Sequence, residues 1–227
     1  MSNIYLVRHG QAGTRHNYDA LSELGRRQAR LLGEHLAAEG LRFDVAISGG
    51  LRRQQETAAE VAAAMPCFPP VEVLEGWNEF DLDRVYRSLA PRLSETDAEF
   101  RAGYAEISAA SADPAASIHR RWTPTDLKVI EAWLAGAEVD TESWTEFCTR
   151  VRGCEMPEGN VAIFTSATPI AVWAAAAMDV NDHRIMRIAG VLLNSSYTVV
   201  RVRDGKLRLF SLNNVPHLTD PEMRTHR

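Results

Sequence analysis

The stretch that decides the fold is IYLVRHGQ, residues 4–11. Its first four residues form a short apolar run with β-branched side chains at both ends, and polar sequence that contains glycine follows immediately. This pattern is typical of a buried strand, which we expect to end at Arg8. In open α/β sheets, ligands bind outside the carboxyl ends of the strands. Arg8, His9 and Gly10 therefore stand where a binding site is expected.

Strand-like and helix-like segments alternate along the chain after this stretch. Ser22 is a candidate cap for a helix that Gly40 ends, and an apolar run at 160–165 predicts another buried strand. Asp204-Gly205 between two strand-like runs is a strong hairpin signal. This alternation implies a mainly parallel sheet with helices on both faces and an antiparallel edge. The other predicted segments are strands at 43–47, 71–74, 191–202 and 207–212, a helix at 51–65 and an apolar helix that opens at 168–169.

The segment 81–158 differs in character, because apolar residues at helical spacing replace the strand signals. TPTD at 123–126 is a strong helix start, with its first threonine as the cap and its aspartate completing a capping box. We therefore predict a helical insertion within a single domain of residues 1–227. Residues 113–117 are the only linker-like stretch. The apolar repeats are Phe100, Tyr104 and Ile107, followed by Leu127, Ile130 and Leu134.

The composition is that of an ordinary globular protein with mild acidity. The chain has 227 residues, with 25 Lys and Arg against 30 Asp and Glu, so its net charge is −5. This gives no general electrostatic reason to bind nucleic acid or an anionic membrane. No signal peptide is visible, and the longest apolar run, 170–178, is far too short to cross a bilayer. Three cysteines without metal-ligand spacing predict reduced thiols. We expect a cytoplasmic protein with no nucleic-acid or membrane partner, and a homodimer is left open.

The tripeptide Arg8-His9-Gly10 has the residue types that phosphoryl transfer needs. A neutral imidazole is a good nucleophile near neutral pH, and an adjacent guanidinium disfavours its protonation and offers a fork of donors to phosphate oxygens. Gly10 allows close approach of the backbone. A tripeptide of this length also recurs by chance at strand-to-loop junctions, so it does not identify a site by itself.

The surrounding sequence makes the case more specific. Three segments together resemble the signature of the histidine phosphatases and the cofactor-dependent phosphoglycerate mutases. This resemblance implies a three-layer α/β/α sandwich like that of phosphoglycerate mutase. The segments are LVRHGQ at 6–11, DALSELGRRQA at 19–29 and SGGLRRQQETA at 48–58.

The resemblance also implies roles for individual residues. It makes His9 the covalent phosphoryl acceptor, Arg8 and Arg53 the phosphate-binding arginines, and Gln11 a substrate contact. Matching the third segment places the second arginine at Arg53 and makes Arg52 its variable neighbour. Arg53 falls in the first turn of the predicted helix, where a phosphate would meet a guanidinium and the positive end of a helix dipole. The alternative is that Arg53 is a solvated helix residue, the usual place for arginine.

A general acid is expected in WNEFD at 77–81, which resembles the superfamily stretch that carries it. Glu79 is then the candidate that protonates the departing alkoxide. Glu75 is the competing candidate. We prefer Glu79 because the two residues after it continue the match and because Trp77 could shield it from water. An ordinary surface glutamate remains the alternative.

The pattern breaks where the superfamily normally carries a second histidine after a late strand. Ser166 stands in that place, followed by Ala167 and Thr168, whose N–H groups open a helix that favours anions. Serine still donates a hydrogen bond, but loss of one donor from a preorganised site can cost about 10²-fold or more in rate. Either the enzyme works with serine in that place, or the protein only binds phosphorylated ligands. We favour activity, because the other site residues remain. His217 could fold back toward the site, but such a histidine more often packs or caps.

The sequence therefore predicts a phosphomonoester hydrolase that acts through a phosphohistidine on a small phosphorylated metabolite. No metal or cofactor is expected, because the arginines supply the positive charge. A mutase and a non-catalytic phospholigand-binding module are the alternatives. Specificity is expected to come from the insertion, although its tryptophans Trp122, Trp133 and Trp144 are the kind of residue more often found in a core. The residues assigned to catalysis are His9, Glu79, Arg8 and Arg53, and those assigned to substrate binding are Gln11 and Ser166.

Overall fold

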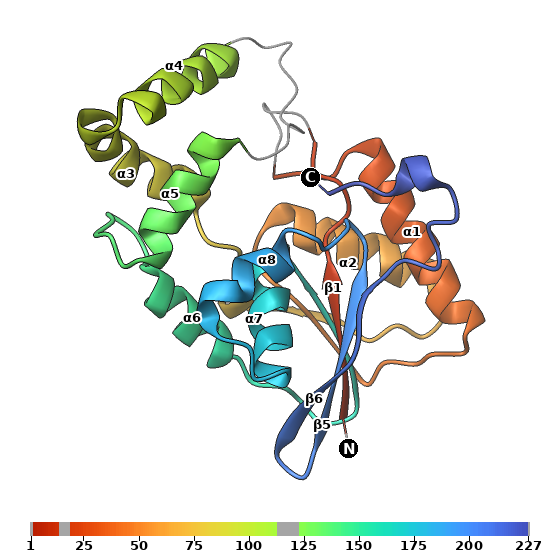
Figure 1. The fold of residues 1–227 in the computed structure, drawn as a ribbon. Coiled ribbons are helices and arrows are strands. Elements are labelled where there is room, and N and C mark those ends of the chain that lie inside the picture. Colours follow the sequence, from red (N-terminus) through yellow and green to blue (C-terminus); the bar gives the residue numbers. More distant parts are fainter. Residues whose placement is uncertain (1, 14–18, 113–122, 227) are drawn as a thin grey trace. The chain divides into compact units, whose positions relative to one another are not determined.

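A computed structural model describes residues 2–13, 19–112 and 123–226, apart from the side chains of 110–112. The chain forms two compact units (Figure 1). Met1–Glu79 together with Val151–Arg227 is termed the sheet unit, and Phe80–Arg150 is termed the helical unit. The assignment of both units to a single domain stays a prediction.

The sheet unit is built on a sheet that, among the described residues, has six strands in the order β3-β2-β4-β1-β5-β6 (Figure 1). The first four strands in this order are parallel, whereas β5 runs antiparallel to β1 and β6 antiparallel to β5. The predicted mainly parallel sheet with an antiparallel edge is confirmed. The strands are β1 (Ser2–Arg8), β2 (Val45–Ser48), β3 (Val71–Val73), β4 (Asn160–Thr165), β5 (Tyr197–Arg203) and β6 (Lys206–Asn214).

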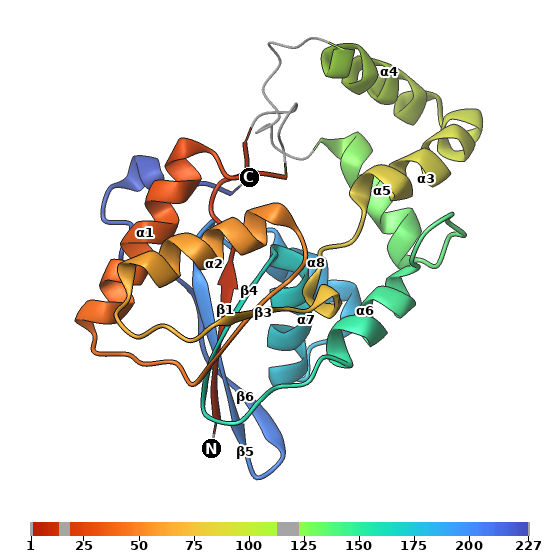
Figure 2. The same ribbon diagram turned by 180° about the vertical axis from the view of Figure 1, so that it is seen from behind.

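Helices cover both faces of this sheet, as Figures 1 and 2 show. The helices α1 (Glu23–Ala38) and α2 (Arg52–Ala64) lie on one face, and α7 (Ala167–Ala177) lies on the other, with α8 (Ile185–Ala189) beside it. The three-layer α/β/α sandwich is confirmed. Short 3-10 helices complete the unit at η2 (Glu75–Trp77), η3 (Asp182–Arg184) and η4 (Pro221–Met223). The core under α1 and α2 comprises Val7, Ala29, Leu32, Leu36, Phe43, Ala58, Val61, Met65, Ala162 and Phe164.

The predicted start and end of α1 and the predicted hairpin turn are also confirmed. Ser22 accepts a hydrogen bond from the N–H of Gly25 at 3.0 Å and so caps α1. Gly40, with a φ of +69°, follows the end of that helix. Asp204 and Gly205 both have positive φ between β5 and β6, as a two-residue hairpin turn of type I′ requires.

The strand predicted from Val191 begins only at Tyr197, so the prediction was wrong for residues 191–196. The N–H of Ser195 and the side-chain amide of Asn194 both donate to the carbonyl oxygen of His9, at 3.1 and 3.2 Å. Ser195 has a φ of 59°, which turns the chain. The segment therefore bends to support the residue after β1 instead of extending along the sheet.

The helical unit contains helices and no strand in its described residues, 80–112 and 123–150. Its core is an aromatic cluster in which the ring centroid of Phe80 lies 4.5 Å from Trp133 and 5.7 Å from Phe147. Trp133 also lies 5.2 Å from Trp144, so both tryptophans are core residues. The helices are α3 (Leu82–Thr96), α4 (Ala98–Ala112), α5 (Pro124–Leu134) and α6 (Trp144–Arg152), of which α6 continues into the sheet unit.

The predicted start of α5 is confirmed. Thr123 accepts from the N–H of Asp126 at 3.2 Å, and the Asp126 carboxylate accepts from the N–H of Thr123 at 2.7 Å. This compact unit ends at Arg150, whereas the insertion was predicted to reach 158. The linker-like stretch at 113–117 and Trp122 lie outside the described residues.

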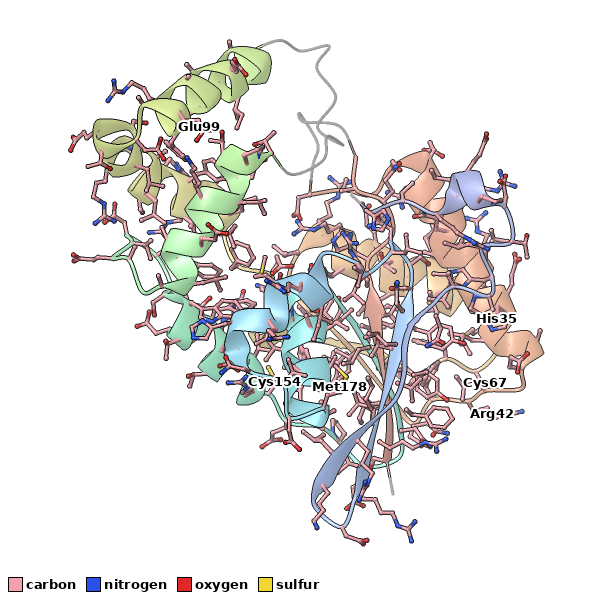
Figure 3. The ribbon with its side chains drawn as sticks, in the orientation of Figure 1. His35, Arg42, Cys67, Glu99, Cys154 and Met178 are labelled. Carbon is pink, nitrogen blue, oxygen red and sulfur yellow. The ribbon has the colours of Figure 1, made fainter. Side chains whose placement is uncertain are left out.

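The described residues also bear on the thiols and on membrane crossing. The cysteines are free, and Cys67 and Cys154 lie well apart in Figure 3, as the expectation of reduced thiols requires. The apolar run predicted as a buried helix forms most of α7. Within the described ranges, no helix has both the length and the apolar character needed to cross a membrane.

Candidate active site

Strand register brings three segments to one edge of the sheet. Arg8 at the end of β1 pairs with Thr165 at the end of β4, and the N–H of His9 donates to the carbonyl oxygen of Thr165 at 2.9 Å. On the other side of β4, the N–H of Gly49 donates to Phe164 at 3.0 Å. The residues that directly follow β1, β2 and β4 are therefore neighbours. This is the edge at which the sequence predicted a site.

The loop after β1 is packed tightly against α1. A Cβ atom on Gly10 would lie 2.4 Å from the carbonyl oxygen of Gly25, a distance that no side chain tolerates. The N–H of Gly10 donates to the hydroxyl of Thr57 on α2 at 3.0 Å. Gly10 thus does allow a close backbone approach, as predicted, but the partner is α1.

His9 is buried and is held in one tautomer by two hydrogen bonds. Nδ1 lies 2.7 Å from the carbonyl oxygen of Gly10, which can only accept, so Nδ1 carries the proton. Nε of Arg53 donates to Nε2 of His9 at 3.3 Å, so Nε2 presents its lone pair. Burial, and after it the positive charges of Arg53 and Arg8, hold the pKa of His9 well below its usual value, while the bond to Gly10 acts weakly the other way. The imidazole is therefore neutral at neutral pH, with its lone pair on Nε2, and its role as a nucleophile stays a prediction.

Arg53 and Arg52 point in different directions. The side chain of Arg53 is only 11% exposed, and besides His9 it binds the Asp19 carboxylate through Nη1 at 2.8 Å. The side chain of Arg52 is 59% exposed and pairs with Glu56 on the next turn of α2. The structure thus places Arg53, the arginine chosen from the sequence, beside the imidazole.

Arg8 is buried next to the same imidazole. Two of its guanidinium nitrogens donate to the backbone carbonyl oxygens of Leu192 and His226. Its charge reaches His9, since it is one of the causes of that residue's lowered pKa. The guanidinium is therefore anchored by the C-terminal part of the chain, and its contact with phosphate stays a prediction.

Ser166 follows β4 directly and is almost completely buried. Its Oγ accepts a hydrogen bond from Nε2 of Gln54 at 2.9 Å, and it makes no capping bond to α7. Gln54 is itself held by the carbonyl oxygen of Trp77 and by the N–H of Leu51, at 3.3 and 3.2 Å. Since a hydroxyl that accepts one bond can still donate another, Ser166 retains a proton for a ligand.

The carboxylate of Glu79 lies beside the first turn of α7. Its carboxylate accepts a hydrogen bond from the N–H of Thr168 at 3.1 Å. The sequence analysis expected this helix start to favour anions, and a carboxylate of the chain binds the N–H of Thr168. Thr168 is two residues after Ser166, so this contact brings the Glu79 carboxylate close to that part of the chain.

The competing acid, Glu75, lies elsewhere on this edge. It is exposed on η2, and a Cβ atom added to Gly50 would lie 3.3 Å from its Cγ. Asn78 accepts from the N–H of Gly50 at 2.6 Å and ties η2 to the loop after β2. Glu79 thus contacts the helix that follows Ser166, whereas Glu75 lies beside the loop after β2, and the choice between them as the acid stays a prediction.

Two other residues from the sequence analysis have structural partners. Gln11 accepts from the Ser22 hydroxyl at 2.8 Å, so its side chain lies on the cap of α1, and its substrate contact stays a prediction. His217 binds the Ser195 hydroxyl at 3.2 Å and stacks on His35 of α1, which Figure 3 labels, at 6.3 Å. Burial lowers the pKa of His217 to about 4. His217 packs in the fold, as the sequence analysis considered more usual.

Sequence reasoning missed Gln54 and Asp19. Both stand inside segments that carried the family resemblance, so their positions were visible but their partners were not. Among the described residues, no group of three or more His, Cys, Asp and Glu side chains is arranged to hold a metal ion.

Comparison with known proteins identifies the family. The sequence pattern of the histidine phosphatase superfamily (branch 1) matches residues 4–215. The chain is 29% identical over 121 residues to the mitochondrial serine/threonine-protein phosphatase Pgam5 of Caenorhabditis elegans, covering 43% of each protein. It is 39% identical over 94 residues to the protein of the same name from Caenorhabditis briggsae, covering 35% of this chain and 33% of that one. The chain thus spans less than half the length of these curated relatives, and its cytoplasmic location stays a prediction.

Solved structures show the same fold at low identity. Bacillus stearothermophilus YhfR superposes with a TM-score of 0.64 at 17% identity, covering 96% of this chain and all of that one. The mycobacterial glucosyl-3-phosphoglycerate phosphatase superposes with a TM-score of 0.58 at 22% identity, covering 93% and 98%. At such identities the likeness establishes the fold alone.

Proposed function

The chain belongs to the histidine phosphatase superfamily, and from that premise we propose that it is a phosphomonoester hydrolase with Nε2 of His9 as its nucleophile. The observation that carries this proposal is the state of His9. Its Nε2 lone pair is directed at Arg53, its proton is fixed on Nδ1, and its pKa is depressed. A neutral imidazole beside a cationic donor is prepared to attack a dianionic phosphoryl group.

The first half of the proposed reaction transfers the phosphoryl group to the protein. Nε2 of His9 attacks phosphorus in line with the departing oxygen, while Arg53 and Arg8 hold the non-bridging oxygens. The hydroxyl of Ser166 donates a hydrogen bond to one of these oxygens, and Gln54 keeps the serine oxygen in place. As the P–O bond breaks, Glu79 gives a proton to the leaving alkoxide.

The second half returns the protein to its starting state. Water attacks the phosphohistidine, Glu79 takes a proton from that water, and inorganic phosphate leaves with His9 neutral again. We expect this cycle to need no metal or cofactor, because the two guanidinium groups supply the charge that a metal would otherwise provide. The proposed substrate is a small phosphorylated metabolite.

A phospholigand-binding module is the second candidate, and Ser166 is the observation that favours it. A neutral hydroxyl stabilises a developing charge less well than a cationic donor, typically by about 1 kcal/mol or more. If turnover has been lost for this reason, phosphate binding through Arg53 would still remain.

The test is a hydrolysis assay with an aryl phosphate in the presence of a chelator. We expect release of phosphate and, on rapid acid-free quenching, an acid-labile phosphoryl label on the protein. His9→Ala should abolish both, whereas His183→Ala, which alters an exposed histidine on η3, should leave both unchanged.

Three outcomes would redirect the proposal. Intact phosphate binding without turnover at high protein concentration would favour the binding module. Isomerisation of a phosphoglycerate without net release of phosphate would identify a mutase. Labelling that persists in His9→Ala would show that the nucleophile is another residue.

A further inference from the structure

A carboxylate of the chain lies on the donors that the proposed function assigns to phosphate. Oδ1 of Asp19 accepts from Nη1 of Arg53 at 2.8 Å, and Oδ2 accepts from the backbone N–H of Arg52 at 3.1 Å. Arg52 is the first residue of α2. The Asp19 carboxylate therefore meets a guanidinium and a helix N-terminus together, the same combination that favours a phosphate.

The guanidinium that binds Asp19 also covers the nucleophile. Arg53 spans the two groups, with Nη1 on the carboxylate and Nε on Nε2 of His9 at 3.3 Å. A phosphoryl group can reach the nitrogen only if its oxygens take over donors of Arg53. Asp19 and an incoming phosphate therefore compete for the same side chain.

The ion pair between Asp19 and Arg53 can be exchanged for another anion. The Asp19 side chain is 51% exposed and regains water when it leaves, whereas the Arg53 side chain is 11% exposed. Leu21 has an anchor that does not involve Asp19, because its N–H donates to the Glu56 carboxylate at 2.8 Å. Rotation of the Asp19 side chain would vacate its position on Nη1 of Arg53.

We propose that Asp19 is an internal ligand of the phosphate site, which competes with substrate and product for Arg53. This inference rests on the proposed function, since it gives Arg53 the same role. In the molecules in which Asp19 occupies Arg53, no other anion can bind there. The apparent affinity for every competing anion is therefore lowered by the same factor. Asp19 thereby excludes weakly bound anions and helps to displace inorganic phosphate after hydrolysis.

The experiment measures binding, with inorganic phosphate and sulfate as probes in titration calorimetry. Asp19→Asn removes the charge but keeps an oxygen that can accept from the N–H of Arg52. We expect its dissociation constants for both anions to fall by about twofold to fivefold, and by the same factor, as loss of a partly exposed ion pair implies.

The matched control is Asp44→Asn, which changes the net charge equally. Asp44 accepts from the N–H of Asn160 at 2.8 Å and directly precedes β2, at the amino ends of the parallel strands, opposite His9. We expect this variant to bind both anions as the unaltered protein does. Equal gains in the Asp19 and Asp44 variants would reduce the effect to net charge and overturn the inference.

Failure of the inference and failure of the proposed function give different results. Unchanged or weaker phosphate binding in Asp19→Asn overturns the inference, even if the unaltered protein hydrolyses phosphomonoesters. Tighter phosphate binding in Asp19→Asn, together with no turnover by the unaltered protein, supports the inference and contradicts the proposed hydrolase function. If Asp19→Asn does not fold, the inference is tested by NMR on the unaltered protein, through the carboxyl ¹³C resonance of Asp19. It should shift as phosphate is added, and a resonance that does not move contradicts the exchange.

Discussion

The sheet unit and the helical unit bury different chemistry. In the sheet unit, the side chains of His9, Arg53, Gln54 and Ser166 are buried with polar partners. In the helical unit, the core is aromatic, with Phe80, Trp133, Trp144 and Phe147 packed together. Buried polar groups stabilise a fold only when each finds its partner, whereas aromatic rings gain mainly from the apolar area that they bury.

The two sets of contacts also differ in sequence range. Gln54 and Ser166 are 112 positions apart, and their hydrogen bond requires the whole strand order to be correct. The indole N–H of Trp133 donates to the carbonyl oxygen of Glu142, only 9 positions away. The sheet unit thus assembles its site from distant segments. The helical unit combines short-range contacts such as this one with longer-range packing such as that of Phe80 on Trp133.

The largest expected effect tests the aromatic core. Phe147→Ala removes a fully buried ring that contacts Phe80 and Trp144, and we expect the helical unit to lose about 3–5 kcal/mol of unfolding free energy. Hydrogen exchange of the amides in α5 and α6 measures this loss. Leu127→Ala is the control, because that side chain is 50% exposed and its removal should cost less than about 0.5 kcal/mol. A similar loss in both variants would contradict the assignment of this core.

The next effect tests the polar site through adjacent arginines. Arg53→Ala should lower kcat/KM by about 10²–10³-fold, because it removes a preorganised charged donor beside the nucleophile. Arg52→Ala removes only a largely exposed side chain paired with Glu56, and we expect a change below about threefold. Steady-state kinetics on an aryl phosphate compares them. A larger loss from Arg52 would show that the wrong arginine has been placed in the site.

Acid should destabilise the sheet unit through its buried histidines. The pKa of His217 is about 4 in the fold, below the usual 6.5, so between these values the unfolded chain binds a proton that the folded chain does not. Stability therefore falls as the pH decreases from 6.5 to 4, by at most about 3 kcal/mol from this group. His9 acts in the same direction.

Denaturant unfolding at several pH values measures this dependence. The variant His217→Gln cannot take up the proton, so its stability should vary less with pH in this window. An unchanged slope would mean that His217 is not the group responsible. The helical unit gives a contrast, because its sequence contains only one histidine, at position 119, which lies outside the described residues.

The smallest effect compares the two helix caps. Ser22→Ala in the sheet unit and Thr123→Ala in the helical unit should each cost about 1 kcal/mol, because each removes an acceptor for an N–H of the first turn. Only Ser22 also donates to Gln11 in the loop after His9. Ser22→Ala should therefore lower kcat/KM as well. Thermal melts measure the loss of stability in both variants, and steady-state kinetics measure kcat/KM. An equal kcat/KM in the two variants would show that the loop after His9 does not need its hydrogen bond from Ser22.

Local sequence predicted the elements wherever the signal was itself local. The ends of α1, the capping box of α5 and the Asp204-Gly205 hairpin follow from residues within a few positions of each other. The strand predicted from Val191 failed because its residues bond to the carbonyl oxygen of His9, far away in the sequence. A period-two pattern does not reveal a partner of that kind.

The same distinction applies to the candidate site. The sequence by itself determined that Arg8-His9-Gly10 would follow a buried strand and that an arginine would open the helix after the second strand, because both depend on hydrophobic patterning and on motif spacing. Motif matching also chose Arg53 over Arg52, but only the tertiary structure showed that Arg53 binds His9, that Ser166 binds Gln54, and that Asp19 lies on Arg53. These contacts depend on strand register and on the direction in which each side chain leaves its helix. Neither is fixed until the sheet has assembled.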